Sequence, residues 1–102
     1  MIGIFAEIEE ENDYSKDEMK SYAESLAAYM EKELNIRSYE VITDDNRLIV
    51  TLDAGADLKD YIASAYENWT DYAGGLGTSY QVVDMEREKA PFAIDPEGEV
   101  CL

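Results

Sequence analysis

Aspartate and glutamate are the residues of this sequence with the clearest capacity for chemistry. The chain has 24 of them against 8 lysines and arginines, which gives a formal net charge of −16. Carboxylates can hold a hard cation, act as general acids or bases, or attract a basic surface, and their spacing decides among these roles. Two groups stand out. The first is Asp57, Asp60, Glu67 and Asp71, and the second is Glu9, Glu10, Glu11 and Asp13.

The first group lies on one stripe of a predicted helix. Its members, together with Ser64, recur at helical spacing and would line about 21 Å of an α-helix at ~1.5 Å per residue. Lys59 is the nearby cation that could relieve their repulsion, whereas lysines are interspersed among the acidic residues of the first predicted helix. We therefore interpret the stripe as a purposeful negative surface and residues 9–13 as its extension. The opposite face of this helix carries Leu58, Ile62, Ala65 and Trp69.

Catalytic and metal-binding motifs are missing from this pattern. The sequence has no histidine, which is the commonest general base and transition-metal ligand. The acidic run at 9–13 lacks the spacing of an EF-hand loop, and the glycines at 74, 75 and 77 follow a predicted helix without a P-loop lysine. We expect no enzymatic activity, no cofactor and no bound metal. A carboxylate site for Ca²⁺ or Mg²⁺ and a small acid–base enzyme are the remaining alternatives.

The charge also limits the partners of the chain. Phosphate backbones and anionic lipids would be repelled, so we expect neither direct nucleic-acid binding nor membrane association. A protein with a basic surface would be attracted, and a nucleic-acid-binding enzyme or complex offers such a surface. No apolar run approaches the ~18 residues of a membrane span, and the single Cys101 excludes an intramolecular disulfide. We therefore expect a cytoplasmic protein.

Local patterns predict four strands and two helices. A capping box formed by Ser15 and Glu18 begins the first helix, and Asn35 follows its end. Asp53 or Asp57 is expected to cap the second helix, which the glycines at 74 and 75 end. Period-two alternation and runs rich in β-branched residues predict strands at 1–8, 37–43, 47–52 and 79–85, with a hairpin turn at 44–46.

The predicted order β-α-β-β-α-β is typical of a ferredoxin-like α+β sandwich, in which two helices cover one face of a four-stranded antiparallel sheet. The chain of 102 residues has room for one such domain, at residues 1–86, followed by an irregular tail at 87–102. Leu48, Val50 and Leu52 should share the helix-covered face. The residues expected on the other face are Phe5, Glu7, Ile49 and Thr51, with Phe92, Ile94, Val100 and Leu102 of the tail available to cover it.

Tyrosines add a second signal, because their rigid rings with polar tips are enriched at protein interfaces. The chain has eight of them. Tyr61 and Tyr66 lie on the acidic helix and are candidate contacts with a partner, while Tyr29 and Tyr39 are expected at other borders of the apolar stripes. The alternative is that these rings simply surround the core.

In size, charge, the absence of a cysteine framework and the stripe from Asp57 to Asp71, the chain resembles the small acidic proteins with which phages and mobile elements block CRISPR or restriction enzymes. Some of those proteins mimic DNA. Carboxylates about 5 Å apart along a helix are comparable with phosphates spaced ~3.4 Å along a duplex strand. The resemblance covers the profile of the whole chain, and since these proteins share no motif, no site residue is carried over from them.

The resemblance implies a non-enzymatic inhibitor of the anti-CRISPR or antirestriction type, acting in the cytoplasm of a bacterial host. It would occupy the basic, nucleic-acid-binding surface of its partner as a DNA mimic. The alternative is a ferredoxin-like interaction module that uses its open sheet face or a strand edge, with acidity serving solubility. Phe5, Ile49 and Tyr39 would then matter more than the acidic helix.

Overall fold

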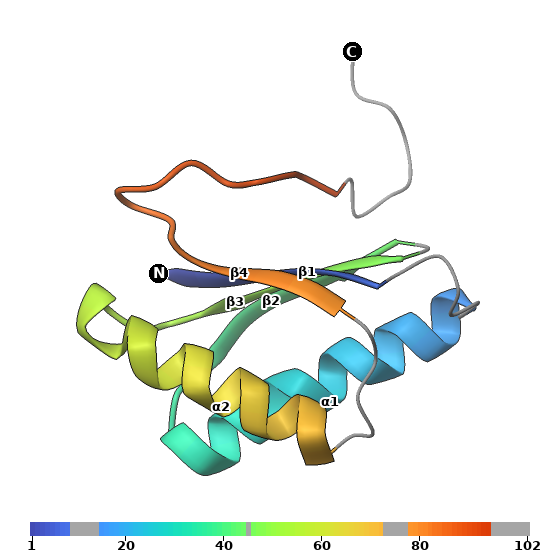
Figure 1. The fold of residues 1–102 in the computed structure, drawn as a ribbon, viewed down its shortest axis with the longest axis horizontal. Coiled ribbons are helices and arrows are strands. Elements are labelled where there is room, and N and C mark those ends of the chain that lie inside the picture. The colour runs from blue at the N-terminus through green and yellow to red at the C-terminus, as the bar shows by residue number, and fades with distance from the viewer. Residues whose placement is uncertain (9–14, 45, 73–77, 95–102) are drawn as a thin grey trace.

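The computed structural model of the chain describes residues 1–8, 15–44, 46–72 and 78–94. Along these residues, four strands and two α-helices follow one another in the predicted order (Figure 1). The strands are β1 (Ile2–Ile8), β2 (Ser38–Thr43), β3 (Arg47–Leu52) and β4 (Thr78–Asp84). The helices are α1 (Lys16–Leu34) and α2 (Lys59–Tyr72), and a short 3-10 turn, η1 (Ala56–Leu58), precedes α2.

The capping box predicted at the start of α1 is present. The Glu18 amide donates to Ser15 Oγ at 3.2 Å, and the Ser15 amide donates to Glu18 Oε1 at 3.4 Å. These bonds satisfy amides that have no partner within the helix. At the other end Asn35 adopts the left-handed conformation, with φ 54°, and the next residue, Ile36, is buried. The sequence therefore predicted both boundaries of α1 correctly.

The strands form one antiparallel sheet in the order β2-β3-β1-β4. The predicted hairpin joins β2 to β3 through Asp44, whose amide donates to the Arg47 carbonyl at 3.0 Å. The Asp44 carboxylate accepts the Arg47 backbone amide and two guanidinium bonds, at 2.7 and 3.1 Å. This α+β arrangement is compatible with a ferredoxin-like fold.

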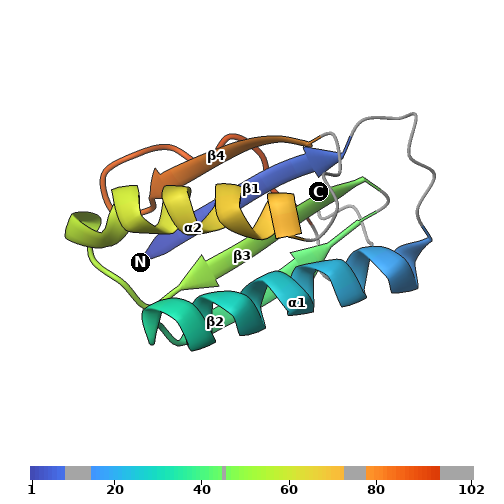
Figure 2. The ribbon, with the colours of Figure 1, turned by 60° about the horizontal axis from the view of Figure 1, so that its bottom comes forward.

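The two faces of the sheet bury different sets of side chains because alternate residues of a strand point in opposite directions. Both helices pack against one face (Figures 1 and 2). Leu48, Val50 and Leu52 are fully buried on that face, as predicted. They join Ile2, Ile4 and Ala6 of β1, Met19, Ala23, Leu26 and Met30 of α1, and Ile62, Ala65, Tyr66 and Trp69 of α2.

Residues 85–94, which we call the strap, cross the opposite face of the sheet (Figure 1). Ile94 is buried there with Phe5, Ile49 and Val83, and the Phe92 ring meets the Phe5 ring edge-on at 5.4 Å. The Arg47 guanidinium carbon lies 5.0 Å from the centre of the Phe92 ring. Val100 and Leu102, also predicted to cover this face, lie outside the described residues.

Glycine at position 3 leaves room for the start of the strap to lie close against β1. A Cβ atom there would lie 2.7 Å from Phe5 Cε1 and 2.8 Å from Met85 Sδ. The methionine can move, but the Phe5 ring is 2% exposed and is held by Phe92. The residue without a side chain therefore fits where β1, β4 and the start of the strap meet.

The predicted cap of the second helix is wrong. Neither Asp53 nor Asp57 caps α2, because the chain enters it through η1, whose N-cap is Gly55 without a side-chain hydrogen bond. The Asp53 amide still donates to the Arg37 carbonyl at the end of the sheet, and Asp57 lies within η1. The Leu58 amide closes the turn by donating to the Gly55 carbonyl at 3.1 Å. The glycines predicted to end the helix lie outside the described residues.

Candidate acidic interface on helix α2

Helix α2 has a buried face and an exposed face. Ile62, Ala65 and Trp69 are buried, and Leu58 packs partly buried against the same core, as their spacing predicted. The opposite face is in contact with solvent. Its exposed residues, together with Asp57 of η1, are Asp60, Tyr61, Ser64, Glu67, Asn68 and Asp71. We call the four carboxylates Asp57, Asp60, Glu67 and Asp71 the α2 acidic face.

The α2 acidic face does not lie on one continuous α-helix. From Asp60 to Asp71 it follows α2 for about 16 Å at ~1.5 Å per residue. Asp57 lies in the 3-10 turn before the helix, where the rise is ~2.0 Å per residue, so the length of about 21 Å predicted for a single α-helix does not apply to the whole face. All four residues are nevertheless exposed, and Asp60, Glu67 and Asp71 recur at helical spacing along α2.

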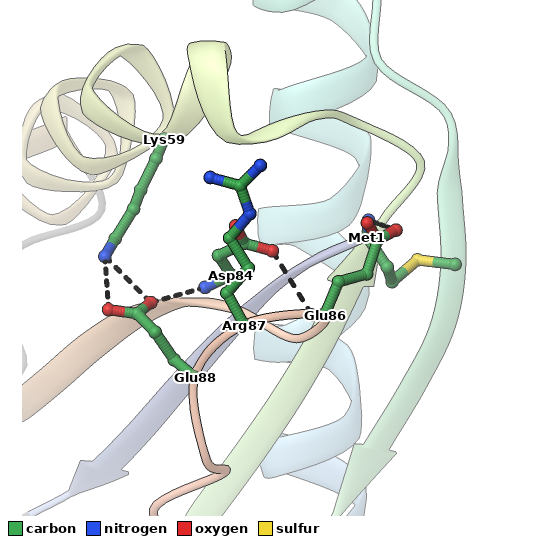
Figure 3. Close-up of polar contacts among 6 residues, drawn as sticks. All are labelled: Met1, Lys59, Asp84, Glu86, Arg87 and Glu88. Carbon is green, nitrogen blue, oxygen red and sulfur yellow. Dashed lines mark hydrogen bonds and ion pairs between the residues drawn. The ribbon is translucent and has the colours of Figure 1, made fainter.

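Lys59, the cation expected to relieve this face, is turned toward the strap instead. Its ammonium donates to both carboxylate oxygens of Glu88, at 3.0 and 2.9 Å (Figure 3). Glu88 also accepts the Asp84 amide at 2.7 Å. The hydrogen bonds from Lys59, and then the one from the Asp84 backbone, hold the pKa of Glu88 below its usual value. The positive charge next to Asp60 in the sequence is thus already paired.

The other ion pairs of the described residues also lie away from this face. The Met1 amine pairs with Glu86 at 3.1 Å, and the Arg87 guanidinium lies 3.9 Å from the Asp84 carboxylate (Figure 3). Arg47 pairs with Asp44 in the hairpin. Among the side chains that the structure describes, no ion pair includes a carboxylate of the α2 acidic face. Its charge is therefore available to a partner.

One carboxylate of the face is held in place by the sheet. The Tyr80 hydroxyl on β4 donates to Glu67 Oε1 at 2.8 Å, and the Tyr80 ring stacks on Tyr66 with centroids 4.3 Å apart. Burial, and then the hydrogen bond to Glu67, raise the pKa of Tyr80 to about 12. Glu67 consequently has one oxygen that accepts from Tyr80, and its position is fixed relative to the sheet.

The structure separates the two tyrosines predicted to contact a partner. Tyr61 is 65% exposed and lies among the carboxylates of α2. Tyr66 is 1% exposed and packs between Trp69 and Tyr80, so its assignment to the partner surface is wrong. Its spacing from Ile62 and Trp69 already placed it on the apolar face, a signal that the sequence contained. Tyr39 on β2 is 72% exposed, and Tyr29 on α1 is partly buried against the core.

Two long-range contacts of this site were not predicted. Lys59 meets Glu88 across 29 positions of the chain, and Glu67 meets Tyr80 across 13. Neither pair has a local sequence signal, because each depends on how α2 lies over β4. Once α2 and β4 are placed side by side, the phase of the helix and the alternation of the strand bring Glu67 and Tyr80 together.

Other kinds of site are limited in the described residues. Among them, no group of three or more acidic, histidine or cysteine side chains is arranged to hold a metal ion. The helices described here lack the length and apolarity needed to cross a membrane.

Glu9, Glu10, Glu11 and Asp13, the predicted extension of the acidic surface, lie outside the described residues. Comparison of the chain with protein families, characterised proteins and solved structures found no match.

The helix dipole predicts opposite effects at the two ends of the α2 acidic face. Asp60 lies in the first turn, where a negative charge is favourable, whereas Asp71 lies in the last turn, which has no basic residue. Asp71→Asn should raise the free energy of unfolding by about 0.3–1 kcal/mol, and Asp60→Asn should lower it by a similar amount. Urea denaturation at low salt measures both. Equal signs for the two variants would contradict this account.

Tyr80 predicts an alkaline loss of stability. Its pKa of about 12 in the folded chain exceeds the ~10 of an unfolded tyrosine, so its contribution is complete below pH ~10 and is lost as the pH rises toward 12. Tyr80→Phe should flatten the fall in unfolding free energy across this window. Glu67→Gln should keep part of the fall in unfolding free energy, because Tyr80 stays buried. Denaturation series at successive pH values test this, and identical slopes for the native chain and Tyr80→Phe would refute it.

Proposed function

We propose that this chain is a non-enzymatic inhibitor or regulator that binds a basic, nucleic-acid-binding surface of a partner protein. The observation that carries the proposal is the α2 acidic face: four exposed carboxylates in a row, none in an ion pair with a described residue. Such a face is not optimised for the stability of its own helix, since like charges one turn apart repel. A role in binding accounts for this arrangement.

The chemistry of the partner follows from the charge. Lysine and arginine side chains that normally contact phosphates would meet carboxylates one to two helical turns apart, about 5–10 Å, through the same counterion-dependent attraction. Tyr61, 65% exposed within this row, offers a ring on which an arginine guanidinium can stack. In its specific form the proposal is a DNA mimic of the anti-CRISPR or antirestriction type, encoded by a phage and active in the bacterial cytoplasm. Duplex DNA should then compete for the same surface.

We also assign the chain to the ferredoxin-like type of α+β fold. The support is the strand order β2-β3-β1-β4 with every neighbouring pair antiparallel, together with two helices on one face (Figure 2). The fold by itself implies no activity, because one fold supports many functions. Its contribution is to hold α2 firmly, so that the acidic residues project from a rigid support.

The alternative function, a protein–protein interaction module, is favoured by the exposure of the edge strand β2. Phe5 and Ile49 are 2% and 6% exposed beneath the strap, so the sheet face they were expected to offer is occupied by the chain itself. Tyr39 is 72% exposed on β2, which is an edge strand. A module of this kind would therefore use the β2 edge.

Capture experiments with matched variants test the proposal. The immobilised chain is exposed to a bacterial extract at ~50 mM and ~200 mM salt, because binding to a basic groove should weaken steeply over this range. The binding of captured proteins to labelled duplex DNA is then measured with and without the chain. We expect the chain to displace the DNA. A variant that neutralises the α2 acidic face, with Asp57→Asn, Asp60→Asn, Glu67→Gln and Asp71→Asn, should weaken this displacement by about tenfold or more.

A control variant carries the same change in net charge elsewhere. It combines four substitutions at exposed positions on β1, on α1, after β3 and in the strap, namely Glu7→Gln, Glu33→Gln, Asp53→Asn and Glu86→Gln. This variant should retain displacement within about threefold, as expected for charges outside the contact surface. Equal losses in both variants would mean that net charge matters and the α2 acidic face does not. Capture without any displacement of DNA would eliminate the mimic.

A further inference from the structure

We infer that the outer edge of β2 binds an extended segment of another protein, carrying lysine or arginine at alternate positions, which adds to the sheet as a further strand. This surface lies beside α1, on the far side of the sheet from β4 (Figure 2). The inference concerns a second surface and does not rest on the function proposed for the α2 acidic face.

The backbone of β2 has groups that face outward. The Asp44 amide donates to the Arg47 carbonyl, and the Thr51 hydroxyl donates to the Glu40 carbonyl, so these two residues turn toward β3. Because an antiparallel ladder alternates, Val41 and Thr43, opposite Val50 and Leu48, turn their backbone groups away from β3. Among the described residues, none donates to or accepts from those outward groups.

The two halves of this edge are not equally protected. Near its start the register shifts between Ser38 and Glu40, and the Glu31 carboxylate of α1 accepts from both the amide and the hydroxyl of Ser38. A bulge and a capped amide are devices that keep other strands from pairing. The half from Val41 to Thr43 keeps regular pairing with β3 and contains no lysine or proline. It therefore remains open to an added strand.

A hollow of about 260 Å³ lies beside this open half, between the edge of β2 and α1. Lys20 and Glu24 of α1 form one side, and Val41, Ile42 and Thr43 form the other. A strand laid along β2 would point alternate side chains toward the helices, as Val41 does, and the others toward the opposite face, as Ile42 does. The hollow can thus receive those side chains of the added strand that point toward the helices.

Charge identifies the occupant as a basic segment. Lys20 and Glu24 both border the hollow and offset each other, so the negative charge at this edge comes from Glu40, exposed on β2 itself, and from the net charge of −16 of the whole chain. Lysine or arginine at alternate positions of the added strand would meet Glu40, while its main chain pairs with Val41 and Thr43. Pairing of β2 with a second copy would bring two strongly negative chains together, and their mutual repulsion disfavours it.

The probe for this inference is a blocked peptide of alternating valine and lysine, about eight residues long, the length of a short strand. It is titrated into the isotope-labelled chain, and hydrogen exchange of each amide is followed by NMR. At saturation the amides of Val41 and Thr43 should exchange about tenfold more slowly, because they gain hydrogen-bond partners. A peptide of equal charge with two central valines replaced by proline should bind at least about tenfold more weakly.

Variants of the chain separate backbone pairing from side-chain contact. Thr43→Pro removes an outward amide that β3 does not use, and should weaken peptide binding about tenfold, whereas Thr43→Ala should change it by less than about twofold. Should Thr43→Pro fail to fold, Glu40→Lys serves instead and should weaken binding through charge reversal. The variant with a neutral α2 acidic face should bind the peptide as the native chain does, so that this inference and the proposed function fail separately.

Three results would overturn the inference. The first is unchanged exchange of Val41 and Thr43 at saturating peptide. The second is protection confined to the amides of α2, which would mean that the peptide binds the α2 acidic face by charge alone. The third is a free chain that sediments as a dimer and in which Val41 and Thr43 are already protected, because a second copy would then occupy the edge.

Discussion

The ion pair between Lys59 and Glu88 connects most features of this structure. It joins the first turn of α2 to the strap, and because Glu88 also accepts the Asp84 amide, it closes the end of β4 against the start of the helix (Figure 3). Exposed ion pairs contribute little to stability, so the importance of this one lies in its position. It directs Lys59 away from the α2 acidic face. It also ties down the first part of the strap, which then crosses the other face of the sheet.

The direction in which Lys59 points matters because positive charge is scarce in this chain. With 8 cationic residues against 24 acidic ones, most carboxylates must remain without a partner, and the fold decides which. Arg47 is engaged by Asp44 in the hairpin, and Lys59 by Glu88. Both faces of the sheet are covered, one by the helices and the other by the strap. The outer side of α2 and the edge of β2 are among the surfaces left uncovered, and they are the two for which we propose partners.

Local chemistry allowed much of the fold to be predicted from the sequence. The Ser15 capping box, the alternation of β3 and the turn at Asp44 depend on residues a few positions apart, and each was confirmed. The 3-10 turn was missed because aspartate is favourable both at a helix cap and in a tight turn, so Asp57 did not distinguish them. Of the candidate site, the exposure of the α2 acidic face followed from helical spacing. Its contacts, Tyr80 to Glu67 and Lys59 to Glu88, required the tertiary arrangement.

The central claim is that negative potential is concentrated along α2 and is not uniform over the chain. The most direct measurement compares the NMR relaxation that a cationic and a neutral paramagnetic cosolute of equal size cause at each amide, which reports the local potential. The account predicts the largest excess effect of the cationic cosolute at exposed positions from Asp57 to Asp71, and a smaller one along the outer side of α1, where Lys20 and Lys32 are exposed. An equal excess along both helices, or a larger one on α1, would contradict it.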